Sequence, residues 1–361
     1  GSMGSWLNGN TRISVLKTAA KNLVDILYGA EETQDKLWVG IVPYTTQINV
    51  SPQNIDFLKT TYKNNILNNS TSIFTADNYN NTALGRDVTG DGVNDTVYGW
   101  KGCVEMRDDL NGGTVDLTDD PPANDFVPFF FGSSEGYNNN NKWKSDGVTR
   151  SGSRSPNRQC PPAILPLTAE KTTIKATINS MISSSSGTSV NIGAVWGWRL
   201  LSPRWNGLWY NSSTLNLPTG YTTLPLNYGE EYMDKVIILM TDGENVMSSS
   251  FYNAYSRMEE EGIEEGDPGY NSLYHTEGSG YLSEKTWGYA GMENTKTSQV
   301  CTAMKAAGVI VYTVLLVDGS SSLMKNCATS PKHAFVATSA DELLDNFNTI
   351  GEELSNLRIS K

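Results

Sequence analysis

The chain has 361 residues, of which 38% are hydrophobic, so it is long enough and apolar enough to bury a substantial core. Its formal net charge of -12 and the absence of any run of Lys or Arg argue against a nucleic-acid-binding surface. No stretch approaches the roughly 20 apolar residues of a membrane span, and the first residues lack the pattern of a signal peptide. The composition indicates an acidic globular protein that favours cations as small partners.

Four cysteines occur, none in a C-x-x-C pair, at Cys103, Cys160, Cys301 and Cys327. With only two histidines in the chain, a structural zinc site has little support. The even count, in a chain rich in Asn, Ser, Thr and Gly, favours an oxidising compartment and two disulfides. We predict Cys103–Cys160 and Cys301–Cys327, because each pair stays within one region. Four free thiols of a cytosolic protein are the alternative.

The first periodic segment, RISVLKTAAKNLVDILYG, repeats apolar residues every three or four positions and predicts a helix that ends at Gly29. The next, KLWVGIVPYTTQINV, alternates β-branched and aromatic residues, and its Pro43 predicts one strand that bends into a second, antiparallel strand. Residues 51–166 lose this regularity. They are expected to form an inserted lobe rather than a linker, because their scattered aromatic residues need burial.

Periodicity returns in LTAEKTTIKATINSMI, which predicts a helix, and in NIGAVWGWRLLSP, which predicts a short helix stopped by Pro203. Trp196 and Trp198 in this segment are expected to pack into the core. After a second insertion, the continuous apolar run in DKVIILMTDGEN predicts a strand buried on both faces that ends at Asp242.

The end of the chain is regular. We expect a helix around 300–307, the strand VIVYTVLLV, a loop through Cys327, the short strand HAFVAT and a last helix. That helix begins at a capping box formed by Ser339 and Glu342.

Helices that alternate with buried strands predict an α/β fold with a doubly wound, mostly parallel, Rossmann-like sheet. The predicted core comprises 1–50, 167–203, 233–245 and 293–361. The predicted insertions are 51–166, 204–232 and 246–292. In such sheets ligands bind beyond the carboxyl ends of the strands, which is where Asp242 falls.

Thr241-Asp242-Gly243 places a carboxylate at a strand end, where neighbouring hydroxyls could complete an oxygen-only site for Mg²⁺ or Ca²⁺. Taken alone, the motif is a weak signal, because an Asp that ends a strand is more often a helix cap or a turn former.

The segments GSM, GTSVNIG and VIILMTDG occur in this order around the helix and strands above. Together they resemble the von Willebrand factor A domain and its metal-ion-dependent adhesion site. The resemblance implies a non-enzymatic site for Mg²⁺ or Ca²⁺ that is completed by the carboxylate of a protein partner. Its metal ligands would be Ser2, from a D-x-S/T-x-S loop, Thr188 and Asp242.

Four further strings, WKGCVE, QCPPAILPLT, NIGAVWGWRLLSP and ELSNLRISK, are similar to TadG-like proteins of tight-adherence (Flp) pilus systems. This similarity implies a bacterial envelope protein in pilus assembly or adhesion. Such a protein would be exported to the periplasm or cell surface and held in the membrane by a segment outside this chain.

Gly1-Ser2-Met3 has two interpretations, a remnant of an expression vector or part of the metal loop. A doubly wound sheet of this family needs a central first strand before the first helix, and nothing before Arg12 could form it. We therefore expect the three residues to be native, with the first strand and the other ligands of this loop upstream.

A second metal motif, DVTGDGVND, alternates oxygen-bearing residues, with Gly92 at the sixth position where calcium loops turn sharply. Its predicted Ca²⁺ ligands are Asp87, Thr89, Asp91, the carbonyl of Val93, and Asp95. Tyr98 replaces the usual final Glu, so Glu105 or Asp108 would have to complete the site. A plain Asp/Gly turn is the alternative.

Enzymatic motifs are missing from the sequence: no G-x-S-x-G, P-loop or dinucleotide-binding glycine pattern occurs, and His275 and His333 are expected to be ordinary surface or loop residues. Two rival functions remain. One is a surface adhesin that binds glycan or host protein through its insertions, with Trp205, Trp209 and Tyr210 as an aromatic platform. The other is a metal-dependent hydrolase that uses Asp242.

Overall fold

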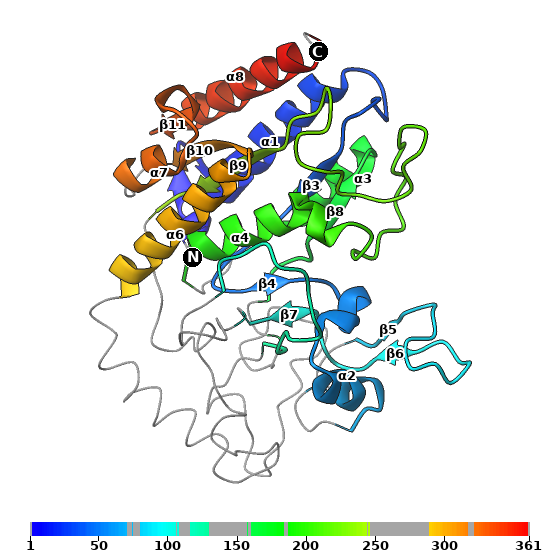
Figure 1. Ribbon diagram of the computed structural model, residues 1–361. Helices are drawn as coiled ribbons and strands as arrows, with labels where there is room; N and C mark the ends of the chain where they lie inside the picture. The colour runs from blue at the N-terminus through cyan, green and yellow to red at the C-terminus, as the bar shows by residue number, and fades with distance from the viewer. Residues whose placement is uncertain are drawn as a thin grey trace.

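The computed structural model describes residues 2–70, 74, 80–105, 107, 116–129, 157, 160–183, 187–243, 245, 289–316 and 321–359. Long helices and a parallel sheet make up one part of the molecule, and a lobe of short strands lies beside them (Figure 1). Of the predicted residues, Asp108 and His275 lie outside the described ranges, as does most of 246–292.

Three parallel strands form the largest sheet, in the order β11-β10-β9. They are β9 (Val236–Thr241), β10 (Ile310–Leu316) and β11 (Ala334–Ala337). Ile237 lies opposite Val311, and Phe335 lies opposite Val314. The three strands expected in 234–245, 309–317 and 333–338 are thereby confirmed.

Helices cover both faces of this sheet. The helices on one face are α1 (Arg12–Tyr28) and α8 (Ala340–Ile359), and on the other face α4 (Val190–Leu201) and α6 (Tyr289–Ala306). A further helix, α3 (Lys171–Ser180), packs against α1. Ile238 and Met240 pack in the cluster of α1 and α8, whereas Ile237 and Leu239 pack in the cluster of α4 and α6. Alternate side chains of β9 therefore enter opposite layers, as the pleat requires.

The helix termini follow the predicted signals. Thr11 caps α1 by accepting a hydrogen bond from the Ser14 amide at 3.3 Å, and Gly29 follows its last turn. At α8 the Ser339 hydroxyl accepts the Glu342 amide at 3.2 Å, and the Glu342 carboxylate reaches back to the Thr338 amide at 2.6 Å. The capping box is present, but the Glu342 carboxylate accepts the amide of Thr338 rather than that of the cap residue Ser339.

The antiparallel pairing predicted within 36–50 is reduced to one isolated bridge between Tyr44 and Ile48. β3 (Val39–Ile41) pairs antiparallel with β8 (Leu165–Thr168), while β4 (Ile48–Asn49) pairs antiparallel with β7 (Cys103–Val104). The segment between β3 and β4 carries the chain from the α/β part into the lobe (Figure 1). The two strands therefore find partners far away in sequence.

The lobe contains short elements around a core of aromatic residues. Its further elements are η2 (Pro52–Phe57), α2 (Thr60–Leu67), β5 (Thr82–Ala83), β6 (Thr96–Val97) and η3 (Pro203–Trp205). Trp205 stacks on Trp209 with ring centroids 5.3 Å apart, and Phe57 meets both rings edge-on. These contacts place aromatic residues from 51–166 and from 204–232 in one core.

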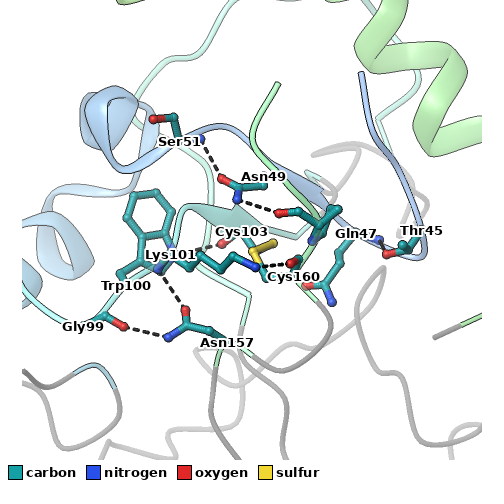
Figure 2. The surroundings of a disulfide bond; sticks show 11 residues. Thr45, Gln47, Asn49, Ser51, Gly99, Trp100, Lys101, Cys103, Asn157 and Cys160 are labelled. Atoms are coloured by element: carbon teal, nitrogen blue, oxygen red, sulfur yellow. Dashed lines mark hydrogen bonds between the residues drawn. A yellow bond between two sulfur atoms is a disulfide. The ribbon is translucent and has the colours of Figure 1, made fainter. Parts of the chain in front are cut away.

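Both predicted disulfides are present. Figure 2 shows Cys103–Cys160 beside Trp100, whose indole nitrogen donates to the Cys103 carbonyl at 2.9 Å. Cys301–Cys327 joins α6 to α7 (Ser321–Cys327), a helix in the segment that the sequence predicts as a loop.

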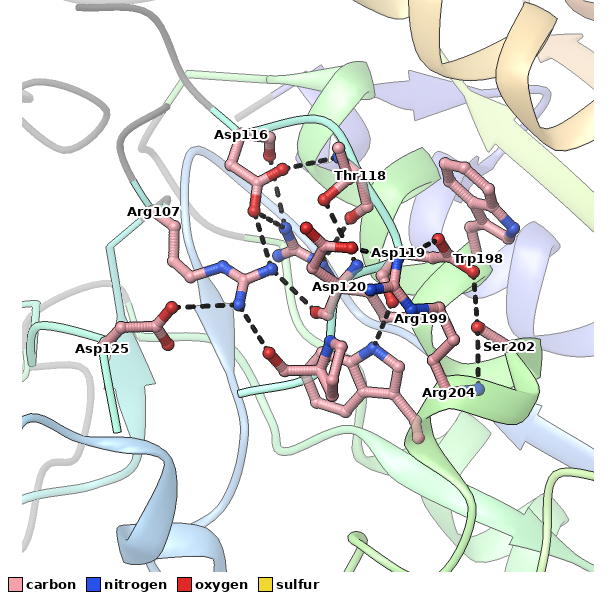
Figure 3. Close-up of polar contacts among 12 residues, drawn as sticks. Arg107, Asp116, Thr118, Asp119, Asp120, Asp125, Trp198, Arg199, Ser202 and Arg204 are labelled. Carbon is pink, nitrogen blue, oxygen red and sulfur yellow. Dashed lines mark hydrogen bonds and ion pairs between the residues drawn. The ribbon is translucent and has the colours of Figure 1, made fainter. Parts of the chain in front are cut away.

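A network of charged side chains ties the lobe to α4 (Figure 3). Arg199 on α4 is fully buried and lies over the Trp196 ring, with Cζ 4.9 Å from the ring centroid. Its Nη2 lies 3.4 Å from the Asp116 carboxylate, which Arg107 also contacts at 2.6 Å. Burial lowers the pKa of Arg199 to about 9, and the repulsion of Arg107 acts in the same direction. Asp116 therefore acts as the shared counter-ion of two packed guanidinium groups.

The fold is mixed α/β, with helices on both faces of a parallel sheet. One continuous doubly wound sheet is not observed, since the described residues form five small sheets and β3–β8 is separate from β9–β11. None of the helices in the described ranges has the length and apolar character to cross a membrane.

Candidate metal centre

Asp242 follows the last residue of β9, and its side chain is only 3% exposed. The strand is held by β10 on one edge and by helix layers on both faces, so its carboxyl end is a fixed point of the fold. A carboxylate in this position is poor in water contacts and needs partners of opposite charge or hydrogen-bond donors.

The first partner of Asp242 comes from the other end of the sequence. The Ser2 hydroxyl donates to Asp242 Oδ1 at 2.7 Å across 240 residues. Ser2 begins the short 3-10 helix η1 (Ser2–Gly4), and its carbonyl accepts the Ser5 amide at 2.8 Å. The structure therefore brings together two of the three residues expected at the adhesion site.

The second partner is Arg12, which the sequence analysis missed. Its Nη1 lies 3.2 Å from Asp242 Oδ2 and 3.4 Å from the Asp242 carbonyl. A small hairpin, β1 (Trp6–Leu7) and β2 (Asn10–Thr11), returns the chain so that the Arg12 amide donates to the Ser5 carbonyl at 2.9 Å. Arg12 is the first residue of α1, and no acidic residue lies in the first turn of that helix. A positive charge at a helix start without a local acidic partner is the sequence signal that could have identified it.

The third expected residue, Thr188, lines the same cavity as Asp242. The loop that carries it is held by backbone bonds, because the next residue, Ser189, donates its amide to the Thr45 carbonyl at 3.0 Å. Tyr44 also lines the cavity and donates its hydroxyl to the Met240 carbonyl at 2.6 Å. Burial raises the pKa of Tyr44 above its ordinary value, and the nearby Asp242 charge adds to this, so the phenol stays a neutral donor.

Asn245 was also missed and links the β9 loop to two helices. Its side-chain oxygen accepts the Val190 amide at the start of α4 at 2.7 Å, and its nitrogen donates to Asn294 on α6 at 2.8 Å. Next to Asn294 in the sequence, Glu293 is 1% exposed, and burial raises its pKa to about 7 despite a hydrogen bond with Ser189. The Thr188 loop thus rests on a buried polar junction between α4 and α6.

These residues fit a hard divalent cation by their chemistry. Asp242 offers carboxylate oxygens, Ser2 and Thr188 offer hydroxyl oxygens, and the Arg12 guanidinium is a competing charge on the same carboxylate. Mg²⁺ and Ca²⁺ prefer such oxygen ligands and leave room for water or a partner's carboxylate. A cation on the carboxylate would displace the guanidinium, because both need the same oxygen atoms.

The calcium-type loop is tightly wound around its own carboxylates. Asp87 accepts the amides of Gly90 and Gly92 at 2.6 and 2.7 Å, which lowers its pKa, and Asp95 accepts the Val88 amide at 2.6 Å. Gly92 has a φ of 88°, which the sharp turn requires. The carboxylates point to backbone donors, and the described ranges contain no group of three His, Cys, Asp or Glu side chains that could hold a metal. Calcium at Asp87, Thr89, Asp91, Val93 and Asp95 therefore stays a prediction.

Two other expectations are settled by burial. Trp205 is completely buried and Trp209 is half-buried, so these rings belong to the lobe core, and an aromatic platform for glycan built on them is wrong. Of the three aromatic residues of the expected platform, Tyr210 is the exposed one, at 41%. His333 is not a surface residue either: it is 9% exposed and meets the Tyr312 ring edge-on, with centroids 4.6 Å apart.

No protein-family profile matches the sequence, and no curated protein matches it. Among solved structures, proximal thread matrix protein 1 from the mussel byssus is 16% identical over 53% of this chain and 30% of its own, with a TM-score of 0.27. Another structure of that protein, described as having a zinc-occupied MIDAS motif, is 16% identical over 58% of this chain and 40% of its own, with a TM-score of 0.29. The aligned parts span less than half of those chains, and TM-scores this low carry no argument about this chain.

Proposed function

We propose that the protein is a non-catalytic binding protein that holds a divalent cation, Mg²⁺ or Ca²⁺, with Ser2, Thr188 and Asp242. The observation that supports this most directly is the 2.7 Å hydrogen bond between Ser2 and Asp242, from opposite ends of the chain. Thr188, the third expected ligand, lines the same cavity as Asp242.

The cation would recruit an acidic group of a protein partner. The three side chains supply fewer oxygens than the six or more that these cations take, so positions remain for water or for a carboxylate from outside. Arg12 lies beside these positions and, once displaced from Asp242, adds a second positive group for the incoming carboxylate. Docking by this route would depend on the metal and weaken with salt.

An exported protein of the bacterial envelope, working in pilus assembly or adhesion, is the setting we propose. Two disulfides support an oxidising compartment. The pilus connection rests on the sequence similarities to TadG-like proteins alone.

Titration calorimetry with Mg²⁺, Ca²⁺ and Zn²⁺ tests the proposal. We expect the unmutated chain to bind at least one cation and Asp242→Asn to lose one site, while any binding of Ca²⁺ at the calcium-type loop is kept. Asp234→Asn is the matched control, because Asp234 stands before the opposite end of the same strand and the substitution removes the same charge. Equal heats for the unmutated chain and Asp242→Asn would place the bound cation elsewhere.

A further inference from the structure

Tyr44 holds the strand end that carries Asp242. Its hydroxyl donates to the Met240 carbonyl at 2.6 Å, and the Thr241 side chain is its second hydrogen-bond partner. The Thr241 hydroxyl in turn donates to the Gly243 carbonyl at 3.2 Å. These contacts lie on both sides of Asp242 in the sequence. The backbone that carries the candidate metal carboxylate is therefore fixed through Tyr44.

The residue that follows Tyr44 holds the Thr188 loop. The Thr45 carbonyl accepts the Ser189 amide at 3.0 Å, one residue after Thr188. The Thr45 amide donates to the Gln47 carbonyl at 3.3 Å, so the turn is also bonded within itself. Two consecutive residues of one turn therefore fix the backbones of both candidate ligands relative to each other.

The ring of Tyr44 packs directly on α4. A methyl group at Gly193 of that helix would lie 2.6 Å from the nearest ring carbon, closer than a Cβ atom approaches a ring in a folded protein. The ring therefore needs a glycine at this position. At Gly197, one turn further along α4, a methyl group would meet nothing nearer than Ile237 at 3.6 Å, an ordinary contact. The ring lies in the layer of α4, and α4 sets its position.

The two candidate cations place different demands on such a site. Mg²⁺ requires near-ideal octahedral geometry with ligands at roughly 2.0–2.1 Å, whereas Ca²⁺ accepts ligands at about 2.3–2.6 Å in irregular arrangements. A fixed spacing of the ligands therefore matters more for Mg²⁺ than for Ca²⁺. Any change that loosens the spacing should weaken Mg²⁺ more.

We propose that Tyr44 is a positioning residue that favours Mg²⁺ over Ca²⁺ at the candidate metal centre, by fixing the Asp242 carboxylate relative to Thr188. This inference rests on the proposed function, because it concerns the same site. Tyr44 is not a ligand in this proposal, since its hydroxyl is engaged with the end of β9. Removing that hydroxyl leaves the charges and the ligand oxygens of the site in place and changes only how firmly they are held.

Two pairs of variants isolate the role of Tyr44. Tyr44→Phe removes only the hydroxyl, and Tyr312→Phe is its matched control, because the buried Tyr312 of β10 loses a bond of its hydroxyl to Glu353, at 2.9 Å, in the same sheet. Gly193→Ala displaces the ring from α4. Gly197→Ala adds the same methyl group to the same helix where there is room for it.

Titration calorimetry gives the ratio of the Mg²⁺ and Ca²⁺ dissociation constants for each variant. Asp87→Ala with Asp91→Ala is the common background, so that Ca²⁺ at the calcium-type loop does not contribute. We expect Tyr44→Phe to weaken Mg²⁺ about tenfold, the equivalent of one buried hydrogen bond, and Ca²⁺ less than about threefold. Gly193→Ala should shift the ratio in the same direction, and the two control variants should leave it unchanged.

An unchanged ratio in Tyr44→Phe would overturn the proposal, even if both cations bind more weakly, because a general loss of stability affects both alike. An equal shift in Tyr312→Phe would overturn it as well. Asp242→Asn distinguishes this failure from that of the proposed function. If Asp242→Asn binds both cations as the background does, Asp242 holds no cation and both proposals fail. If it loses the cation while Tyr44→Phe keeps the ratio, only the role of Tyr44 is wrong.

Discussion

Arg12→Gln is the perturbation that tests how the candidate metal centre works. In the structure the Arg12 guanidinium lies 3.2 Å from an Asp242 carboxylate whose side chain is 3% exposed, while the Arg12 side chain is 15% exposed. Glutamine keeps a hydrogen-bond donor and removes the charge. Because the guanidinium and a cation compete for the same oxygens, the substitution should lower stability without metal and strengthen cation binding.

The magnitudes follow from the burial of the pair. Breaking a fully buried ion pair costs roughly 3–5 kcal/mol, and the partial exposure of Arg12 reduces this to about 2 kcal/mol. If competition by Arg12 weakens the cation tenfold, the variant gains about 1.4 kcal/mol more from saturating metal than the unmutated chain does.

Urea unfolding with chelator and with saturating Mg²⁺ or Ca²⁺ measures both quantities. Lys21→Gln is the control, since it removes a positive charge from the same helix without touching Asp242. If metal raises the unfolding free energy of Arg12→Gln and of the unmutated chain equally, Arg12 does not compete with the cation. If the unfolding free energy without metal is the same for both, the Arg12–Asp242 ion pair does not stabilise the fold.

Three further predictions concern the calcium-type loop, a buried carboxyl and a disulfide. In the Asp242→Asn background calcium should still raise the melting temperature, and adding Asp87→Ala with Asp91→Ala should remove the effect; a calorimetric calcium titration of the unmutated chain without heat of binding would disprove the loop assignment. Burial raises the pKa of Glu293 to about 7 against an ordinary 4.5, so its contribution is full below pH 4.5 and is lost as the pH rises through 7. Glu293→Gln should therefore remove about 3 kcal/mol of pH dependence from the unfolding free energy, and an unchanged pH profile would contradict this. Replacing Cys301 and Cys327 by Ser opens a loop of 26 residues and should cost about 3.5 kcal/mol by loop entropy, whereas stability equal to the unmutated chain would argue against that bond.

The strands of the parallel sheet were predictable because their signal is local. The apolar runs before Thr241 and around Tyr312 are continuous, bounded and β-branched, and each became a strand of the sheet. The same holds for the capping box at Ser339, where two residues three apart determine the local geometry.

Pairing was not predictable in the same way. The alternation in residues 36–50 indicates extended backbone, but it carries no information on partners, and β3 and β4 pair with strands more than 50 residues away. Helix α7 was missed because its seven residues, which end at the disulfide cysteine Cys327, are too few to show a helical repeat of apolar residues.

The candidate site shows the same division. Asp242 could be found from the end of its own strand, whereas the role of Arg12 depends on a contact across 230 residues that no spacing reveals. Asn245 likewise acts through α4 and α6 at once. The sequence therefore located Asp242 and its partner Ser2, but missed Arg12, which neutralises the carboxylate, and Asn245, which holds the following loop.

A crystal of the full chain soaked in Mn²⁺ tests the central claim most directly. We predict an anomalous difference peak at metal–ligand distance, roughly 2.0–2.6 Å, from oxygens of Asp242 and Ser2, with Thr188 directed toward it and Arg12 displaced. The account would be contradicted by a saturated soak with Arg12 still on Asp242 and no peak beside that carboxylate.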